Sequence, residues 1–119
     1  MFYISRDFKF DAAHKLEKYH GKCEALHGHT YKLRVTLCGY PDEEGMVIDF
    51  VELKNIVREE IIDQLDHSYL NETISQPTAE NIAKWVWDRL KIKLTSNRYK
   101  LCEIAIWESE DTFVTYRGE

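Results

Sequence analysis

The residues best suited to chemistry gather near the amino terminus, where Cys23, His27 and His29 lie within seven positions. In an extended backbone, side chains two residues apart point to the same face, so His27 and His29 would present their imidazoles side by side. Gly28 between them lets another backbone or a ligand approach closely. Neutral imidazole suits zinc, and two ligands on one strand need only one or two more from elsewhere. The spacing therefore predicts part of a zinc site.

The alternation of apolar residues predicts where a third ligand comes from. From Phe2 to Ala12 the apolar residues fall on even positions, which indicates a half-buried strand, and His14 continues that core-facing series. The segment 30–38 alternates in the same way, and His27 and His29 belong to its apolar, odd-numbered series. If the two strands pair antiparallel, the three histidines converge on one face at one end of the sheet. Three histidines with an open fourth position are typical of a catalytic zinc rather than a structural one.

The rest of the chain predicts the elements that support this site. Asp49 is placed to cap a helix, and Thr78 is placed to cap a second one. Apolar stripes at helical spacing follow each cap: Leu53, Ile56, Val57, Ile61 and Leu65 in the first helix, and Ile82, Ala83, Val86 and Leu90 in the second. Strands are predicted at 100–108, with Cys102, Ile104 and Ile106 facing the core, and at 112–116. The order ββααββ predicts an α+β fold: a four-stranded antiparallel sheet with two helices on one face.

Composition narrows the class of protein. A chain of 119 residues with 44% hydrophobic residues is expected to form a single domain, residues 1–119, with its own core. The net charge is −5 and no basic block is present, so a nucleic-acid partner is not expected. The charged amino terminus does not suit a signal peptide, and no apolar stretch has the length of a membrane span. Three cysteines without framework spacing favour a reducing, cytoplasmic location.

Further side chains with catalytic potential lie outside the histidine trio. A thiol at Cys23, near a metal or an imidazolium, deprotonates readily and can act as a base, although it could instead close the site as a fourth zinc ligand. Asp66 precedes His67 directly, and a carboxylate can orient an imidazole as a proton shuttle, although a surface pair at a helix end is the alternative. Glu108 continues the core-facing series of its strand, where an unpaired carboxylate would be costly. We therefore expect Glu108, outside the metal shell, to bind an amidine-like edge of a ligand.

These motifs together resemble the 6-pyruvoyl-tetrahydropterin synthase and 6-carboxy-5,6,7,8-tetrahydropterin synthase family. The segments that carry the resemblance span nearly the whole chain: Ala13-His14, Cys23-x-x-x-His27-Gly28-His29-x-Tyr31, Leu65-Asp66-His67-Ser68-Tyr69-Leu70-Asn71, Pro77-Thr78-Ala79-Glu80-Asn81 and Trp107-Glu108-Ser109. The resemblance implies the tunnelling fold (T-fold), in which trimers close an oligomeric β-barrel and two trimers stack into a homohexamer. It also implies active sites at subunit interfaces and 7,8-dihydroneopterin triphosphate as substrate.

The same resemblance implies a role for each matching position. The zinc ligands would be His14, His27 and His29; the catalytic residues Cys23 as base with Asp66 and His67 as a proton relay from a neighbouring subunit; and the substrate-binding residues Glu108, Thr78 and Glu80. Glu108 would anchor the amino-pyrimidine edge of the pterin, and Thr78 and Glu80 would line its pocket. The implied cofactor is Zn²⁺.

The product is left open by these motifs. The compact length resembles the branch that forms 6-carboxy-5,6,7,8-tetrahydropterin for queuosine-type deazapurine biosynthesis, with release of triphosphate and acetaldehyde, and the 6-pyruvoyl branch is the first alternative. Glu24 overlaps the cysteine motif and resembles relatives that cleave the side chain to 6-hydroxymethyl-7,8-dihydropterin. An alternative from another class is a non-catalytic zinc-stabilised binding module closed by Cys23. Lys15, Lys18 or Lys22 are candidates to meet the triphosphate.

Overall fold

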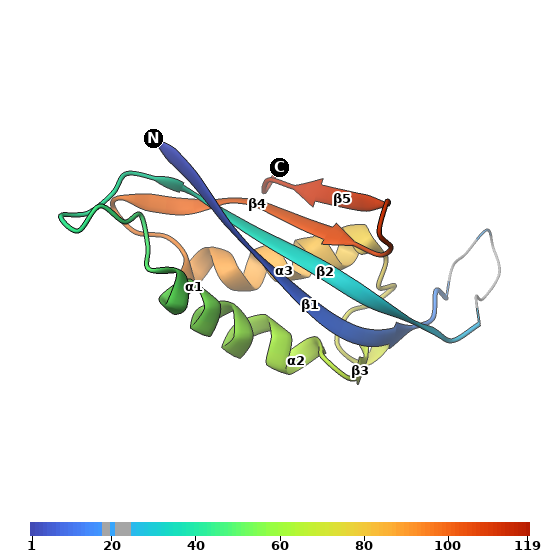
Figure 1. Cartoon of the computed structure of the whole chain (residues 1–119). Coiled ribbons are helices and arrows are strands. Elements are labelled where there is room, and N and C mark those ends of the chain that lie inside the picture. The colour runs from blue at the N-terminus through green and yellow to red at the C-terminus, as the bar shows by residue number, and fades with distance from the viewer. Residues whose placement is uncertain (18–19, 21–24) are drawn as a thin grey trace.

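Two long paired strands form the main part of the sheet. The structure is a computed structural model that describes residues 1–17, 20 and 25–119. Strands β1 (Phe2–His14) and β2 (His27–Gly39) pair antiparallel along their whole length (Figure 1). The even residues of β1 from Phe8 and the odd residues of β2 from Tyr31 are buried, as the alternation predicts. The predicted strand pair and its buried face are thus confirmed.

The first helical segment begins where the sequence predicts. Asp49 caps it, because its carboxylate accepts a hydrogen bond of 2.8 Å from the backbone N–H of Val51. Helix α1 (Phe50–Val57) then continues through a π-helical turn, η1 (Arg58–Ile62), into α2 (Asp63–Leu65). The π-helical turn widens the helix locally, yet the predicted apolar stripe still faces the sheet.

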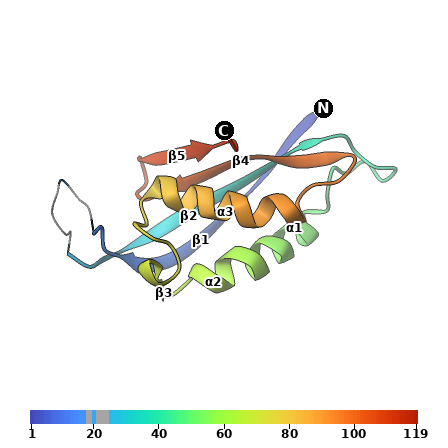
Figure 2. The ribbon, with the colours of Figure 1, turned by 180° about the vertical axis from the view of Figure 1, so that it is seen from behind.

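The second helix, α3 (Ala79–Lys93), is capped by the Thr78 hydroxyl, which accepts a hydrogen bond of 3.1 Å from the Asn81 N–H. Both helical segments cover the same face of the sheet, as Figures 1 and 2 show from opposite sides. Between helices and sheet lies one core, whose fully buried large side chains include Phe10, Tyr31, Leu33, Leu37, Leu53, Ile61, Leu65, Ile82, Leu90 and Ile104. This confirms the α+β class with helices on one face. No helix within the described ranges is both long enough and apolar enough to cross a membrane.

Over the part of the chain that the structure describes, the sheet has five strands rather than the predicted four, in the order β3-β1-β2-β4-β5. Strands β4 (Tyr99–Trp107) and β5 (Phe113–Tyr116) are antiparallel neighbours, as predicted. The extra strand is β3 (Ser68–Tyr69), which pairs parallel with Ala12 and Ala13 of β1 and leads into a 3-10 turn, η2 (Leu70–Glu72). Two residues are too few to show an alternating pattern, so sequence periodicity cannot reveal such a strand.

A β-bulge in β4 changes which residues face the core. Leu37 pairs with Leu101, but Thr36 pairs with Glu103, so Cys102 is an extra residue in the ladder. Leu101 is therefore in the core and Cys102 is only half-buried, which makes the predicted core position of Cys102 wrong. After the bulge the predicted series holds: Ile104 and Ile106 are fully buried. The bulge also decides on which face the residue after Trp107 lies: Glu108 comes level with Tyr31, on the same side as Ile104 and Ile106.

Candidate metal centre

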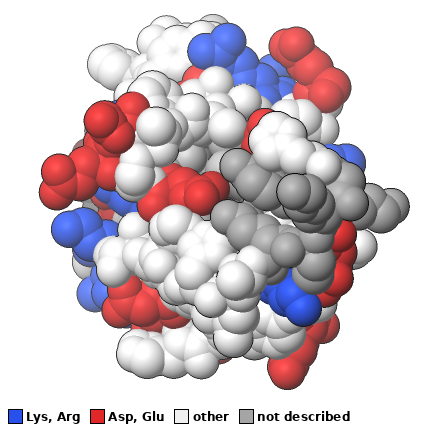
Figure 3. All heavy atoms as spheres, turned by 90° about the vertical axis from the view of Figure 1, so that its right-hand side faces the viewer, with Lys and Arg blue, Asp and Glu red and all other residues white. Residues whose placement is uncertain are grey.

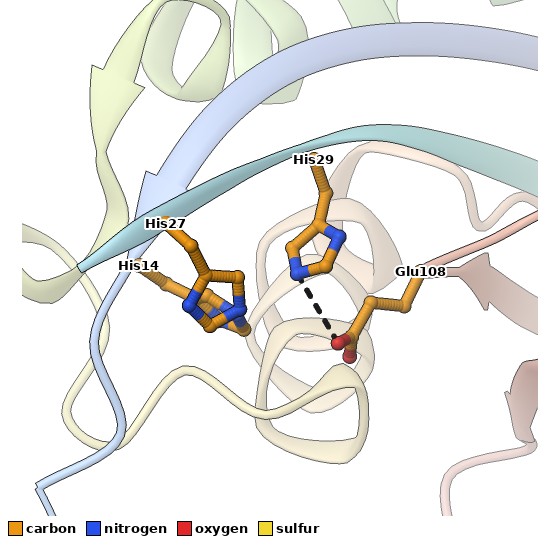
Figure 4. A group of neighbouring side chains, drawn as sticks. All are labelled: His14, His27, His29 and Glu108. Atoms are coloured by element: carbon orange, nitrogen blue, oxygen red, sulfur yellow. Dashed lines mark hydrogen bonds and ion pairs between the residues drawn. The ribbon is translucent and has the colours of Figure 1, made fainter. Parts of the chain in front are cut away.

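The three predicted histidines meet at one end of the sheet, on the face covered by the helices. His14 lies directly opposite His27 in the ladder, and His29 lies opposite Ala12, whose small side chain leaves room for the rings. The ring centroids are 4.5 Å apart for His14 and His27, 5.0 Å for His14 and His29, and 4.7 Å for His27 and His29. Figure 4 shows the rings directed towards one another. The predicted convergence of these side chains is confirmed.

Backbone carbonyls determine which ring nitrogens face the centre of this cluster. Nδ1 of His14 lies 2.8 Å from the Pro77 carbonyl, and Nδ1 of His27 lies 2.9 Å from the Ala25 carbonyl. A carbonyl only accepts hydrogen bonds, so each Nδ1 must carry the proton and each Nε2 is left with a lone pair. These two Nε2 atoms are 3.0 Å apart. Two lone pairs at that distance need a positive charge between them, either a shared proton or a metal ion.

The donor set favours a metal ion. A ligating histidine normally donates its other ring N–H to a carbonyl or carboxylate, and that is the arrangement of His14 and His27. His14 is 1% exposed, so its imidazole is already removed from water and held in place. Its second neighbour is the hydroxyl of Tyr31, 3.2 Å from Nδ1. The cluster is thus able to hold a metal ion that prefers nitrogen ligands.

Glu108 lies in the same group of potential metal ligands as the three histidines, and its place outside the metal shell stays a prediction. Its Oε1 is 3.3 Å from Nε2 of His29, and one ligand atom from each of the four side chains lies within 4.8 Å of the others (Figure 4). The bulge at Cys102 contributes, because it leaves Glu108, the residue after β4, on the core-facing side of the sheet, from which its side chain reaches His29. Burial, and next the nearby Glu108 carboxylate, raise the pKa of Tyr31, so its phenol stays neutral.

Asp66 and His67 form a contact that the sequence left open. Oδ2 of Asp66 lies 3.1 Å from Nδ1 of His67, at the outer edge of β1. Asp11 anchors both residues: its N–H donates to Oδ1 of Asp66 over 2.9 Å, and its carbonyl accepts from the His67 N–H over 2.6 Å. The hydrogen bond from the Asp11 N–H, followed by the charge of His67, lowers the pKa of Asp66. His67 has a φ of 58° and a side chain that is 80% exposed, so its ring is accessible to solvent.

The contribution of Asp11 was missed by the sequence analysis. It acts through its main chain, which no residue pattern reveals. The ligand atoms of Asp11, Asp66 and His67 also lie within 4.8 Å of one another, but this second group is more exposed than the histidine cluster. We interpret it as a carboxylate-oriented imidazole. Its use as a proton relay stays a prediction.

The remaining predicted residues are placed less directly. Thr78 uses its hydroxyl to cap α3, and the carbonyl of the preceding Pro77 orients His14, so the start of this helix supports the cluster. Glu80 is exposed in the first turn of α3. The backbone of Lys15 is held by the Asn71 side chain through hydrogen bonds of 2.9 and 2.7 Å. Four predicted positions lie outside the described residues: Lys18, Lys22, Cys23 and Glu24.

Known proteins resemble this chain over nearly its whole length. The family model described as 6-pyruvoyl tetrahydropterin synthase matches residues 3–119. The 6-carboxy-5,6,7,8-tetrahydropterin synthase of Haemophilus influenzae is 38% identical, over 98% of this chain and 99% of that protein. The dihydroneopterin monophosphate aldolase of Pyrococcus furiosus is 39% identical, over 86% of this chain and 85% of that protein. The structure of Caenorhabditis elegans 6-pyruvoyl tetrahydropterin synthase superposes with a TM-score of 0.86 at 30% identity, covering 99% of this chain and 96% of that one. The chain therefore belongs to the 6-pyruvoyl tetrahydropterin synthase family of lyases.

Proposed function

We propose that this protein is a zinc-dependent lyase that converts 7,8-dihydroneopterin triphosphate into 6-carboxy-5,6,7,8-tetrahydropterin, with release of triphosphate and acetaldehyde. The observation that supports it most is the meeting of His14, His27 and His29 with two Nε2 lone pairs facing each other at 3.0 Å. A zinc ion held there would acidify the hydroxyls of the substrate side chain and stabilise an enediolate. Family membership favours this enzyme over the non-catalytic zinc module.

Protein side chains account for the other requirements of the reaction. The two oxygens of the Glu108 carboxylate can accept hydrogen bonds from the ring N–H and the exocyclic amine of a pterin. Nδ1 of His67 is engaged by Asp66, which leaves Nε2 to take up or deliver a proton at the substrate side chain. Cys23 would act as the base. Thr78 and Glu80 would line the pterin pocket.

We further propose a cytoplasmic homohexamer in which each active site uses two subunits. Within the described residues, β1 pairs on its outer side only through Ala12 and Ala13, so most of that edge is open, and open edges pair readily with other strands. Pairing of this β1 edge with the sheet of a neighbouring subunit would close the barrel. It would also bring the exposed His67 towards the metal centre of a neighbouring chain.

The triphosphate site is expected to be shared between subunits as well. At the end of the sheet that carries the histidines, the Lys and Arg side chains in view form separate groups among acidic ones (Figure 3). A triphosphate needs several cations close together, and the chain has a net charge of −5. Basic side chains from more than one subunit would provide them.

The similarity to the Haemophilus influenzae protein over nearly the full length of both chains favours the 6-carboxy product. Two other products are alternatives with specific support. The solved Caenorhabditis elegans relative is named a 6-pyruvoyl tetrahydropterin synthase, and the Pyrococcus furiosus relative is named an aldolase of dihydroneopterin monophosphate. Glu24 would be the residue to support side-chain cleavage in an aldolase-like reaction.

Mass analysis of the products tests the proposal. The zinc-loaded protein should convert 7,8-dihydroneopterin triphosphate into a 6-carboxy pterin, with acetaldehyde recovered by a carbonyl trap. A product that keeps all side-chain carbons would support the 6-pyruvoyl alternative, and a 6-hydroxymethyl product would support side-chain cleavage. A zinc-loaded, folded hexamer that converts none of the substrate would contradict the proposal. The His29→Ala variant, which lacks one metal ligand, is the matched control.

A further inference from the structure

The end of β1 is held on its outer side by a side chain rather than by a strand. The amide of Asn71 makes two hydrogen bonds to the main chain of Lys15, the residue that follows β1. The Lys15 N–H donates to Oδ1 over 2.9 Å, and Nδ2 donates to the Lys15 carbonyl over 2.7 Å. We propose that Asn71 is a positioning residue for the metal centre, because these bonds fix the main chain next to His14. The proposal rests on the proposed function, in which His14 is a zinc ligand.

The Asn71 amide continues the ladder between β1 and β3. The paired residues of these two strands keep a constant offset in the sequence, and Lys15 and Asn71 share that offset of 56 positions. Asn71 lies in the 3-10 turn η2, where the backbone has left the strand, so its side chain takes the place of the missing peptide group. A carboxamide offers the N–H donor and the carbonyl acceptor that a peptide group would offer. The ladder therefore reaches beyond the two residues of β3 and past His14.

His14 is consequently fixed from both edges of β1. On the inner edge it pairs with β2, and on the outer edge the Asn71 amide binds the N–H of the peptide that joins His14 to Lys15. Asn71 and Pro77, whose carbonyl orients the His14 ring, belong to the same connection between β3 and α3. Leu70 is fully buried and anchors this connection in the core. One anchored segment thus holds both the ring of His14 and the main chain beside it.

Loss of the two bonds would loosen a ligand of the proposed zinc site. Without the Asn71 amide, the N–H and the carbonyl of the half-buried Lys15 lose these partners, and the end of β1 can turn outwards to reach water. The His14 ring, one residue earlier, would then leave its direction towards the other two histidines for part of the time. A metal site is weakened when the supporting contacts no longer hold its ligands in the binding geometry. Asn71 therefore acts on the metal centre through the main chain.

Zinc affinity tests this role without any turnover. Asn71→Leu has a similar size but makes no hydrogen bond, and we expect zinc affinity to fall about tenfold in a chelator competition, the lower end of the usual effect of outer-shell changes. Asn71→Asp keeps the acceptor and loses the donor, so its affinity should lie between the two, and it decides the question if the Leu variant does not fold. Gly39→Ala strains the far end of β2 and controls for a loss of stability alone. Unchanged affinity in the Asn71 variants, or an equal loss in Gly39→Ala, would overturn the proposal.

Hydrogen exchange at the Lys15 N–H tests the contact itself, in the metal-free protein. Exchange should be slow in the unmodified protein and in Asn71→Asp, where an oxygen still accepts the bond, and faster in Asn71→Leu. The N–H of Phe10, inside the ladder with β2, should stay protected in all three proteins. Equal exchange at Lys15 in Asn71→Leu and the unmodified protein would refute the contact. Failure of the unmodified protein to bind zinc would instead contradict the proposed function, and the exchange at Lys15 would still test the contact.

Discussion

Replacing His14 by Ala should abolish tight zinc binding more clearly than any other single change. His14 is the least exposed of the three histidines, and its Nδ1 is held by the Pro77 carbonyl while Nε2 faces His27. Loss of an outer-shell partner typically weakens metal binding by about 10- to 100-fold, so loss of a direct ligand should weaken it by at least about 100-fold, or roughly 2.7 kcal/mol.

The same change predicts a difference in thermal stability. Free zinc at about 100 times the dissociation constant stabilises the unmodified protein by roughly 2.7 kcal/mol, whereas a variant that binds about 100 times more weakly gains only about 0.4 kcal/mol. For a chain of 119 residues, about 1 kcal/mol corresponds to roughly 4 °C in Tm. The zinc-dependent rise in Tm should therefore fall from about 10 °C to about 2 °C. The metal-free variant also loses a donor to the Pro77 carbonyl, so each protein is compared with its own metal-free form.

Chelator competition and melting curves with and without excess chelator, at one fixed protein concentration, provide the measurement. His20→Ala is the matched control, because His20 is an exposed histidine that is not part of the described metal-binding groups. A His14→Ala protein that keeps zinc affinity within tenfold of the unmodified protein, with the full rise in Tm, would refute the assignment of His14 as a ligand.

Three further outcomes are expected. His67→Ala should keep its zinc but lose turnover, and mixing it with Cys23→Ala subunits should restore some activity; no restoration in verified mixed oligomers would argue for a site within one chain. Burial raises the pKa of Tyr31 above its ordinary value near 10. The contribution of the buried phenol to stability is therefore intact below about pH 10 and is lost as the pH rises from there through the raised pKa. Tyr31→Phe should therefore flatten the decline of the urea midpoint above about pH 10, and an unchanged decline would contradict this origin. In Gly39→Ala, a Cβ would lie 2.3 Å from the Arg98 carbonyl oxygen, so we expect a loss of about 1–3 kcal/mol in the free energy of unfolding with unchanged zinc affinity; an undiminished urea midpoint would show that the backbone adapts.

The histidine cluster could be predicted because it depends on the strongest signal in the chain. Alternation with period two places His14, His27 and His29 on the buried face, and one antiparallel pairing brings them together whatever the loop between the strands does. The two helix starts were predictable for a similar reason, since Asp49 and Thr78 cap the backbone next to them.

Features that depend on long-range main-chain contacts could not be predicted. Strand β3 is two residues long and is held against β1 by Asp66 and His67, whose hydrogen bonds reach the main chain of Asp11, far away in the sequence. The carbonyl of Pro77 that orients His14 has no side-chain signature either.

The position of Glu108 was half predictable. The alternation of apolar residues predicts that it faces the core side of its strand, and it does face the same side as the core residues Ile104 and Ile106. Its distance from His29 depends on the register between β2 and β4, and one extra residue at Cys102 shifts that register. Nothing in an alternating pattern shows which residue a bulge leaves unpaired, so the contact between Glu108 and His29 came only from the structure.

Anomalous diffraction at the zinc absorption edge can show whether the three histidines bind one zinc ion. Crystals of the zinc-loaded protein should show one strong anomalous peak per chain, at about 2.0–2.1 Å from a ring nitrogen of His14, His27 and His29. An anomalous peak at Asp11, Asp66 and His67 instead, or none at the histidine cluster in crystals that contain zinc, would show that these histidines are not the zinc ligands.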